Sequence, residues 1–350
     1  MKRIAPPVLF VAAFPLVCLL SLTAAPQALA DGFGGYALSL RLPAALSRFS
    51  SYADVAGVGG ASAASTWASS VNPASADWRD IPGSHSICFC PQYSAIPFQE
   101  GSVVNVANES LTYQDPQWGT FLPALAQVRS NHADTLQGLG FKYDMDYYQM
   151  QWGKRFAEDW AVGANFNYSP AKVDFNAGPA PASLSTTDSY DFRLGVVHQL
   201  LERLRCGVVF DYGFTPSRTT LYDFLGTGAG DTVVHDTGYQ YLLRPGLAFE
   251  YQKDSDIYCD YQFAAFTDST GQLYINRFML GIDHQVIKGF FVRSGVALDD
   301  FRSAGWSVGV GVYPSEKFTI DLAYQYNMFP ELYPELRRSQ TFALSVGLAF

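Results

Sequence analysis

The chain ends in the stretch TFALSVGLAF (341–350), in which apolar and small or polar side chains alternate without a break. The apolar set occupies every second position: Phe342, Leu344, Val346, Leu348 and Phe350. Successive side chains of a β-strand point to opposite faces of the sheet. The pattern therefore predicts a strand with one wholly apolar face, and it sets the fold class for the rest of the chain.

The same alternation recurs upstream. It is clearest at 160–168, 190–196, 205–214, 239–250, 290–298, 306–312 and 318–327, and weaker at 86–93, 101–113, 118–129, 143–156, 257–266 and 273–285. Several runs approach the ~9–11 residues that a tilted membrane strand requires. Aromatic residues lie near their ends, as interfacial girdles predict. We expect an all-β fold, a transmembrane antiparallel β-barrel of about 14 strands.

The predicted turns fall into two classes. Short turns are expected near 157–159, 201–203, 253–256, 287–289 and 314–317, and long loops near 171–187, 216–237 and 329–339. Short periplasmic turns opposite longer outer loops are typical of outer-membrane barrels.

Residues 1–30 have the features of a cleaved secretory signal peptide. Lys2 and Arg3 precede an apolar run from Val8 to Leu22, and Ala28-Leu29-Ala30 forms a small-x-small cleavage site. No later stretch reaches the ~18 apolar residues of a transmembrane helix. An exported apolar chain without such helices spans a membrane as a closed barrel. The C-terminal stretch resembles the signal read by the outer-membrane assembly machinery, so we expect the Gram-negative outer membrane.

Composition narrows the function classes. Of the 350 residues, 48% are hydrophobic, 15% aromatic and 16% charged, and the charged fraction lies well below the ~25% of soluble domains. Without Lys2 and Arg3, 21 basic and 32 acidic residues remain, a net charge of −11. Because nucleic-acid binding depends on neutralising phosphates with basic groups, we expect no nucleic-acid partner.

The sequence contains no recognisable catalytic, cofactor-binding or metal-binding motif. Five histidines are scattered along the chain, and no Gly-x-Ser-x-Gly, paired-histidine, phosphate-loop or calcium-loop pattern occurs. We therefore expect neither an enzyme nor a cofactor or metal. Cys88 and Cys90 fall on one face of a candidate strand. Three interpretations of this pair remain: a strained disulfide, a metal site, or two small side chains without a special role.

The segment before the first candidate strand resembles a known family. Residues 61–74, ASAASTWASSVNPA, are similar to the N-terminal pattern of the FadL-type outer-membrane transporters of long-chain fatty acids and aromatic hydrocarbons. The resemblance centres on Asn72, Pro73 and Ala74, although Ser75 stands where that family usually has glycine. It implies a hatch at 31–80 inside a barrel formed by 81–350. The barrels of the type IX secretion system share the Asn-Pro-Ala signature and are the near neighbour.

Charged residues on the small-residue faces are expected to line the lumen. They are Arg193, Arg205, Arg244, Glu250, Arg293 and Asp321. Arginines in a lumen can bind a fatty-acid carboxylate through two parallel hydrogen bonds. The alternative is that they form ion pairs that hold the strands and the hatch together.

The resemblance and the strand pattern together suggest a passage for hydrophobic small molecules, fatty-acid-like or aromatic, into the periplasm. Its expected partners are outer-membrane lipid, a hydrophobic small-molecule ligand and the assembly machinery. The alternatives are a structural or secretion-partner barrel without solute transport, and a general diffusion porin.

Overall fold

We describe the protein from a computed structural model of the chain. The residues that it describes are 53–68, 70–78, 86–99, 103–130, 133–134, 139–177, 180–222, 230–269, 271–300, 304–315, 317–329, 332 and 337–350. The expected signal peptide and the first part of the expected hatch, 31–52, lie outside the described residues. No helix in the described part of the chain is long and apolar enough to cross a membrane.

Strands make up most of the described chain. The elements are α3 (Ala53–Gly57), η1 (Pro73–Asp77), β1 (Ser86–Pro97), β2 (Val103–Asp115), β3 (Gly119–Ser130), β4 (Ala133–Asp134), β5 (Leu139–Ala157), β6 (Trp160–Ala177), β7 (Ala180–Leu201), β8 (Leu204–Leu221), β9 (Thr232–Gln252), β10 (Ser255–Asp268), β11 (Gly271–Ile287), β12 (Phe290–Asp299), β13 (Ala304–Ser315), β14 (Phe318–Tyr326) and β15 (Gln340–Ala349).

The strands form one closed antiparallel sheet. β15 pairs with β14 on one side and with β1 on the other. β3 pairs directly with β5, so the two-residue β4 stands outside the ring. Fourteen strands thus close into a barrel, which confirms the expected fold class and strand count. Closure matters because it leaves no barrel strand with an unpaired edge.

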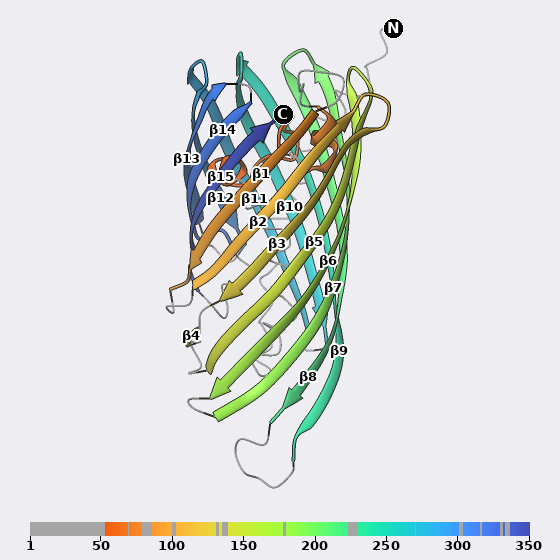
Figure 1. The fold of residues 1–350 in the computed structure, drawn as a ribbon, viewed down its shortest axis with the longest axis vertical. Helices are drawn as coiled ribbons and strands as arrows, with labels where there is room; N and C mark the ends of the chain where they lie inside the picture. Colours follow the sequence, from red (N-terminus) through yellow and green to blue (C-terminus); the bar gives the residue numbers. More distant parts are fainter. Residues whose placement is uncertain are drawn as a thin grey trace.

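The two ends of the barrel differ in length. The connections at the end that carries the C-terminus are all short, while β5 to β9 extend far beyond the other strands at the opposite end (Figure 1). The long loop expected at 171–187 is wrong, because β6 continues to Ala177 and β7 begins at Ala180. Residues 171–175 keep a period of two: Val173 and Phe175 are buried, while Lys172 is exposed.

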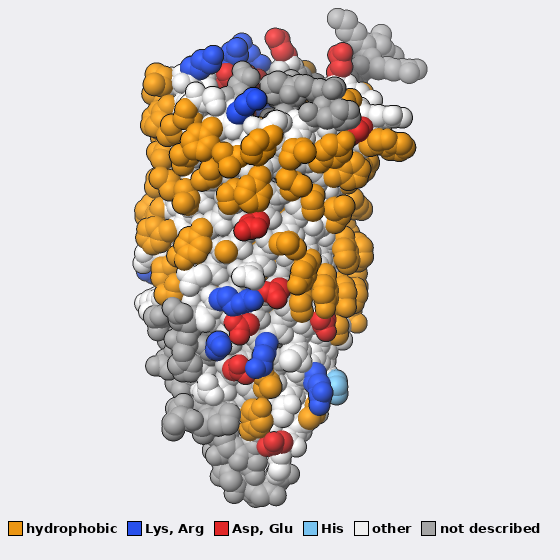
Figure 2. Space-filling view, in the orientation of Figure 1, with side chains coloured by type: hydrophobic (Ala, Val, Ile, Leu, Met, Phe, Trp, Pro, Cys, Tyr) orange, Lys and Arg blue, Asp and Glu red, His pale blue; other side chains and the backbone are white. Residues whose placement is uncertain are grey.

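Large apolar side chains cover the outer face of the barrel. Figure 2 shows them as a broad band on the face that it draws, with most of the charged side chains above and below the band. Leu322 on β14 is 49% exposed, whereas its strand neighbours Asp321 and Ala323 are buried, and Val310, which pairs with Leu322 from β13, is 37% exposed. A band of this kind is the surface that a membrane barrel presents to lipid.

The C-terminal strand continues this pattern to the end of the chain. Phe342, Leu344 and Phe350 are exposed on the outer face, and Val346 and Leu348 are partly covered on the same face. The Phe350 N–H donates to the carbonyl of Ile87 in β1 at 2.9 Å. The last residue is therefore held within the seam between the first and last strands.

Arginine substitutions along β13 test whether the apolar band lies in lipid. We expect Val310→Arg, in the middle of the strand, to lower the free energy of unfolding by about 2–4 kcal/mol, because the guanidinium would lie in hydrocarbon. The matched control is Ser315→Arg at the end of the same strand, where the cost should be about 0–1 kcal/mol. Urea unfolding in lipid vesicles measures both, and equal costs at the two depths would contradict the membrane placement.

Candidate functional site

An N-terminal plug lies inside the barrel, near the end that carries the C-terminus (Figure 1). We use the word plug for residues 53–68 and 70–78, which include α3 and η1. Its small side chains, such as Ala53, Ala61 and Ala64, are completely buried. Backbone and side-chain hydrogen bonds attach the plug to several strands of the wall.

Asn72 joins the plug to the wall. It is the N-cap of η1, where its side-chain oxygen accepts from the Ala74 N–H at 3.0 Å. Its Nδ2 donates to the carbonyl of Ala63 at 2.6 Å and to that of Val196 in β7 at 3.0 Å. Asn72 is fully buried, and so is Ala74, while Pro73 supplies the fixed φ that suits the first helical position. This segment is thus both a turn and a contact with the barrel.

Glycines on the inner face make room for the plug backbone. A Cβ on Gly195 would overlap the side-chain oxygen of Asn72, and one on Gly207 would overlap the carbonyl of Ala63. Only glycine permits such a close approach of two backbones. The small-residue face that the sequence shows along β7 and β8 is therefore the seat of the plug.

Buried ion pairs fix the charged residues at the end of the lumen that holds the plug, which we call the lower lumen although Figure 1 draws it at the top. Arg193 bonds Asp211 at 2.9 Å and donates to the carbonyl of Ser70 at 2.7 Å. Arg244 pairs with Asp260 at 2.9 Å, and the same carboxylate accepts the N–H groups of Ser62 and Ala63 at 2.8 and 2.9 Å. Each pair thus ties two strands to each other and to the plug.

The remaining charged residues follow the same rule, with one exception. Arg205 pairs with Asp256 at 2.6 Å and points its Nε at the Ala64 carbonyl, 3.4 Å away. Glu250 is only half-buried, near the short turn between β9 and β10. It takes part in no ion pair that the described residues show.

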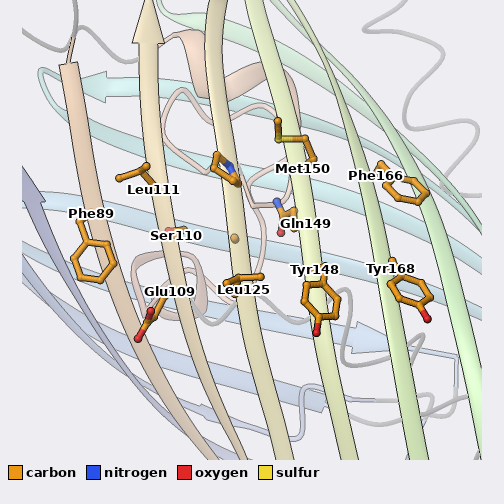
Figure 3. Close-up of a pocket in the computed structure, with 12 residues that line it drawn as sticks. Phe89, Glu109, Ser110, Leu111, Leu125, Tyr148, Gln149, Met150, Phe166 and Tyr168 are labelled. Carbon is orange, nitrogen blue, oxygen red and sulfur yellow. The ribbon is translucent and has the colours of Figure 1, made fainter.

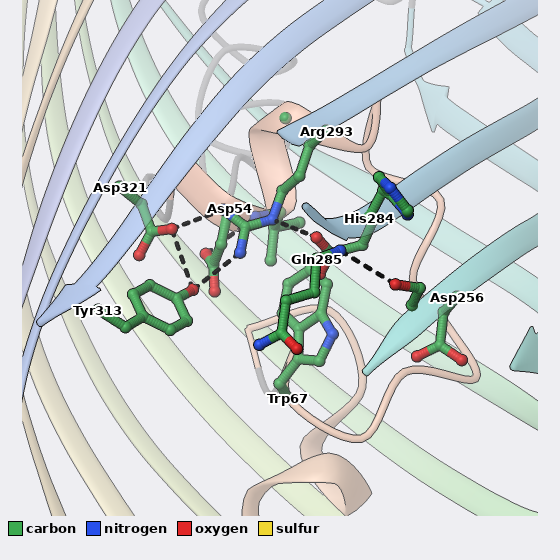
Figure 4. Close-up of polar contacts among 12 residues, drawn as sticks. Asp54, Trp67, Asp256, His284, Gln285, Arg293, Tyr313 and Asp321 are labelled. Carbon is green, nitrogen blue, oxygen red and sulfur yellow. Dashed lines mark hydrogen bonds and ion pairs between the residues drawn. The ribbon is translucent and has the colours of Figure 1, made fainter. Parts of the chain in front are cut away.

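Arg293 lies at the centre of the largest cluster (Figure 4). Its guanidinium pairs with Asp283 at 3.1 Å and Asp321 at 2.5 Å, and donates to the Tyr313 hydroxyl at 2.8 Å. The Trp67 ring of the plug lies 5.7 Å from it. All of these groups come from different strands or from the plug, so the cluster holds β11, β12, β13 and β14 around it.

The sequence predicts the inward arginines but not most of the residues that pair with them. Asp211, Asp256, Asp260 and Asp283 complete the ion pairs, and the Tyr313 hydroxyl accepts a hydrogen bond from Arg293. Asp211 shares its strand parity with Arg205, and Asp283 shares its parity with Arg277, so parity is the signal that could have found these two. Their exact pairing depends on register across strands, which the sequence does not show.

In the half of the lumen away from the plug, which we call the upper lumen and which is drawn in the lower half of Figure 1, the inner face of β1, β2, β3, β5 and β6 is apolar, whereas β7 and β8 carry buried hydroxyl side chains such as Ser185 and Thr219. Buried side chains from β1, β2, β3, β5 and β6 form one cluster that faces inward, and it includes Val106, Val128, Tyr143, Met145 and Val173. Phe329 and Leu332, from the connection between β14 and β15, pack into the same cluster. On these strands the inner face is therefore apolar in this half of the barrel, unlike the small and polar inner face of β7 and β8.

A surface pocket of about 550 Å³ lies across β1 to β6 (Figure 3). Outward side chains such as Leu111, Tyr148 and Phe166 form most of its lining. Ser110, Ala124 and Gln149 also line it, although they belong to the inner face. The pocket therefore reaches residues of both faces of the wall.

Pro123 lies at the same place in β3. The β2–β3 pairing is continuous up to Ser110 and Ala124 and resumes at Tyr113 and Phe121, so it is interrupted beside Pro123. Proline has no N–H to donate, and inside a sheet it removes a ladder hydrogen bond. The sequence therefore weakens the wall beside the pocket.

Cys88 and Cys90 lie on the inner face of β1, with their sulfur atoms 3.3 Å apart. Both cysteines are half-buried, near the end of the barrel that carries the C-terminus. Within the described ranges, no group of three or more His, Cys, Asp and Glu side chains is arranged to hold a metal ion.

The chain is similar in fold to solved transport barrels. The toluene transporter TbuX of Ralstonia pickettii has a TM-score of 0.57 and 11% identity, over 84% of this chain and 96% of that chain. A Pseudomonas aeruginosa FadL homologue has a TM-score of 0.56 and 12% identity, over 85% and 97%. The CymD monoaromatic hydrocarbon channel has a TM-score of 0.55 and 13% identity, over 85% and 99%.

No protein-family model matches the chain, and no curated protein matches its sequence. At the identities above, the similarity establishes the shared fold. The FadL-type architecture implied by residues 61–74 is confirmed at that level.

Gly195→Val tests the attachment of the plug. The new side chain would occupy the position of the Asn72 side-chain oxygen and lie against Pro73, so we expect the plug to detach while the barrel stays closed. The measurement is thermolysin cleavage of the plug in the folded protein, together with single-channel conductance. Both should rise well above the native values.

The control for this variant is Gly347→Val, whose side chain would meet Thr319 of the wall and not the plug. It should leave cleavage and conductance unchanged. If Gly195→Val did the same, the plug would not depend on this contact.

Proposed function

We propose that the protein is an outer-membrane passage for hydrophobic small molecules, fatty-acid-like or aromatic, into the periplasm. The observation that carries the proposal is the apolar cluster on the inner face of the upper lumen. Burying apolar solute surface there is favourable by about 25 cal/mol per Å². A water-filled porin has a polar interior, so an inward apolar cluster suits a hydrophobic solute instead.

The fold similarity supports this proposal. TbuX is described as a toluene transporter and CymD as a monoaromatic hydrocarbon channel. Both share the closed barrel of this chain. The solute of this chain is then expected to be mostly apolar.

We expect the solute to leave the lumen sideways, because the plug lies across the barrel axis. The plug and its ion pairs fill the lower lumen, so a straight passage along the barrel axis meets the Asn72 and Asp260 contacts. The pocket that reaches the inner residues Ser110 and Ala124, beside the interrupted pairing at Pro123, supports a sideways path from the upper lumen to the outer face. A solute taking this path would enter the membrane without crossing the plug.

Several features support export and insertion. The sequence of residues 1–30 favours a cleaved signal peptide, and Phe342, Leu344, Val346, Leu348 and Phe350 favour recognition by the outer-membrane assembly machinery. The exposed apolar band favours lipid as the surrounding solvent. No catalytic role is proposed, because the described inner residues serve ion pairs, plug contacts and apolar packing.

Ala124→Phe tests the sideways path. The ring would fill the inner side of the wall beside the pocket, so we expect uptake of labelled toluene or a labelled fatty acid to fall by roughly half or more. Uptake is measured as the initial rate in cells that produce the chain, relative to cells that lack it. Folding is checked by the heat-dependent shift of the barrel on a gel.

The matched control is Ala107→Phe, an exposed outward alanine on β2. It adds the same ring on the lipid side and should leave uptake unchanged. Equal uptake in cells with and without the chain would overturn the transport proposal. Large, stable openings of the native protein in planar bilayers would favour the diffusion porin.

A further inference from the structure

We infer that the solute carries an uncharged hydrogen-bonding group, such as a hydroxyl, carbonyl or ether, next to an apolar body, and that a belt of amide side chains in the lumen binds that group. The inference rests on the proposed function and deepens it. We use the name amide belt for Gln92, Asn108, Gln149, Gln151, Asn165 and Asn167.

The amide belt lies directly below the apolar cluster on neighbouring strands. Along β5, the inward residues change from Tyr143, Met145 and Tyr147 to Gln149 and Gln151. Along β6, which runs the opposite way, Asn165 and Asn167 precede the apolar Val173.

The belt is continuous across these two strands and repeats on β1 and β2. Gln149 pairs in register with Asn167, and Gln151 with Asn165. Val106 of the cluster is followed on β2 by Asn108, whose Nδ2 donates to Gln92 of β1 at 3.1 Å. A solute seated in the cluster would therefore meet amides at its lower end.

Several polar atoms in this region are buried without a hydrogen bond. Gln151 and Asn167 are fully buried, and Asn165 is 4% exposed. The Nε2 of Gln151 and the Oδ1 of Asn165 have no partner, and the same holds for the hydroxyl of Ser169, the next inward residue on β6. Asn167 lies beside the Tyr147 hydroxyl without a hydrogen bond of good geometry to it.

Such atoms need an explanation, because about nine in ten buried polar groups in proteins are hydrogen-bonded. Leaving a buried donor or acceptor without a hydrogen bond costs free energy, whereas a ligand that supplies the missing hydrogen bond recovers that cost. Donors and acceptors are both open here, so a neutral group that can accept and donate fits them. A pure hydrocarbon would leave them unmet.

The charges around the belt disfavour a carboxylate. Arg193 lies in register with Asn165, but Asp211 and the Ser70 carbonyl already accept its hydrogen bonds. Asp191 lies in register with Asn167 and is 1% exposed. An anionic head would thus approach two buried carboxylates and find the nearby guanidinium committed.

Three ligands with the same chain length separate these possibilities. We propose equilibrium dialysis of labelled 1-decanol, decane and decanoate against the full barrel in lipid nanodiscs at pH 8, with empty nanodiscs subtracted. We expect decanol to bind more tightly than decane by roughly fivefold for each hydrogen bond gained. Decanoate should bind more weakly than decanol.

Asn167→Leu and Gln151→Leu test the belt itself. Each replaces an amide by an apolar group of similar size, so the barrel should fold, and its gel shift confirms this. Decanol affinity should fall to the level of decane, and decane affinity should not fall. The control is Asn105→Leu on the outer face of β2, where Asn105 accepts from the Tyr93 hydroxyl; it should change neither affinity.

The outcomes separate this inference from the proposed function. If none of the three ligands binds, the proposed function fails. If decane and decanol bind equally, or decanoate binds most tightly, the hydrophobic passage stands and the amide belt is overturned. Loss of decanol preference in Asn105→Leu would also overturn it, because the effect would not come from the lumen.

Discussion

The closure of the strand ring is the constraint on which the structure depends. Lipid offers no hydrogen-bond partner, so a spanning sheet must pair every strand edge within itself. The chain meets this condition by joining β1 to β15 and β3 to β5. Closure also creates an inside, and the character of that inside decides what the protein can do.

The lower part of the inside is occupied by a plug that the wall binds through backbone groups. Glycines allow the approach, and buried carboxylates such as Asp260 accept plug N–H groups while pairing with arginines. Breaking one member of such a pair leaves a buried charge uncompensated, which is costly. The arginines are thus structural. Each arginine that the sequence placed in the lumen already pairs with a carboxylate of the protein, so none of them has a guanidinium left to bind the carboxylate of a fatty acid.

The upper part of the inside has a different chemistry. Apolar side chains replace polar ones on the inner face of β2, β5 and β6, and the interrupted pairing beside Pro123 lies next to a surface pocket. An apolar inner face, a belt of amides next to it and the interrupted strand pairing are the features on which the proposed path for a mostly hydrophobic small molecule rests. The plug lies across the alternative path along the barrel axis, which is why we propose a sideways route.

The sequence alone determined the fold class, because a strict period of two around 341–350 and its upstream repeats allows only strands with two distinct faces. It also identified the inward arginines by parity, and the Asn72-Pro73-Ala74 segment by resemblance. It predicted a long loop at 171–187, where the structure has strands. The strands continue there beyond the apolar band, and their apolar side chains, such as Val173, face the lumen instead of the outside. Ion-pair partners, the plug contacts of Gly195 and Gly207, and the amide belt were decided only by the tertiary structure. They depend on register between strands far apart in the chain, and a local pattern carries no record of that register.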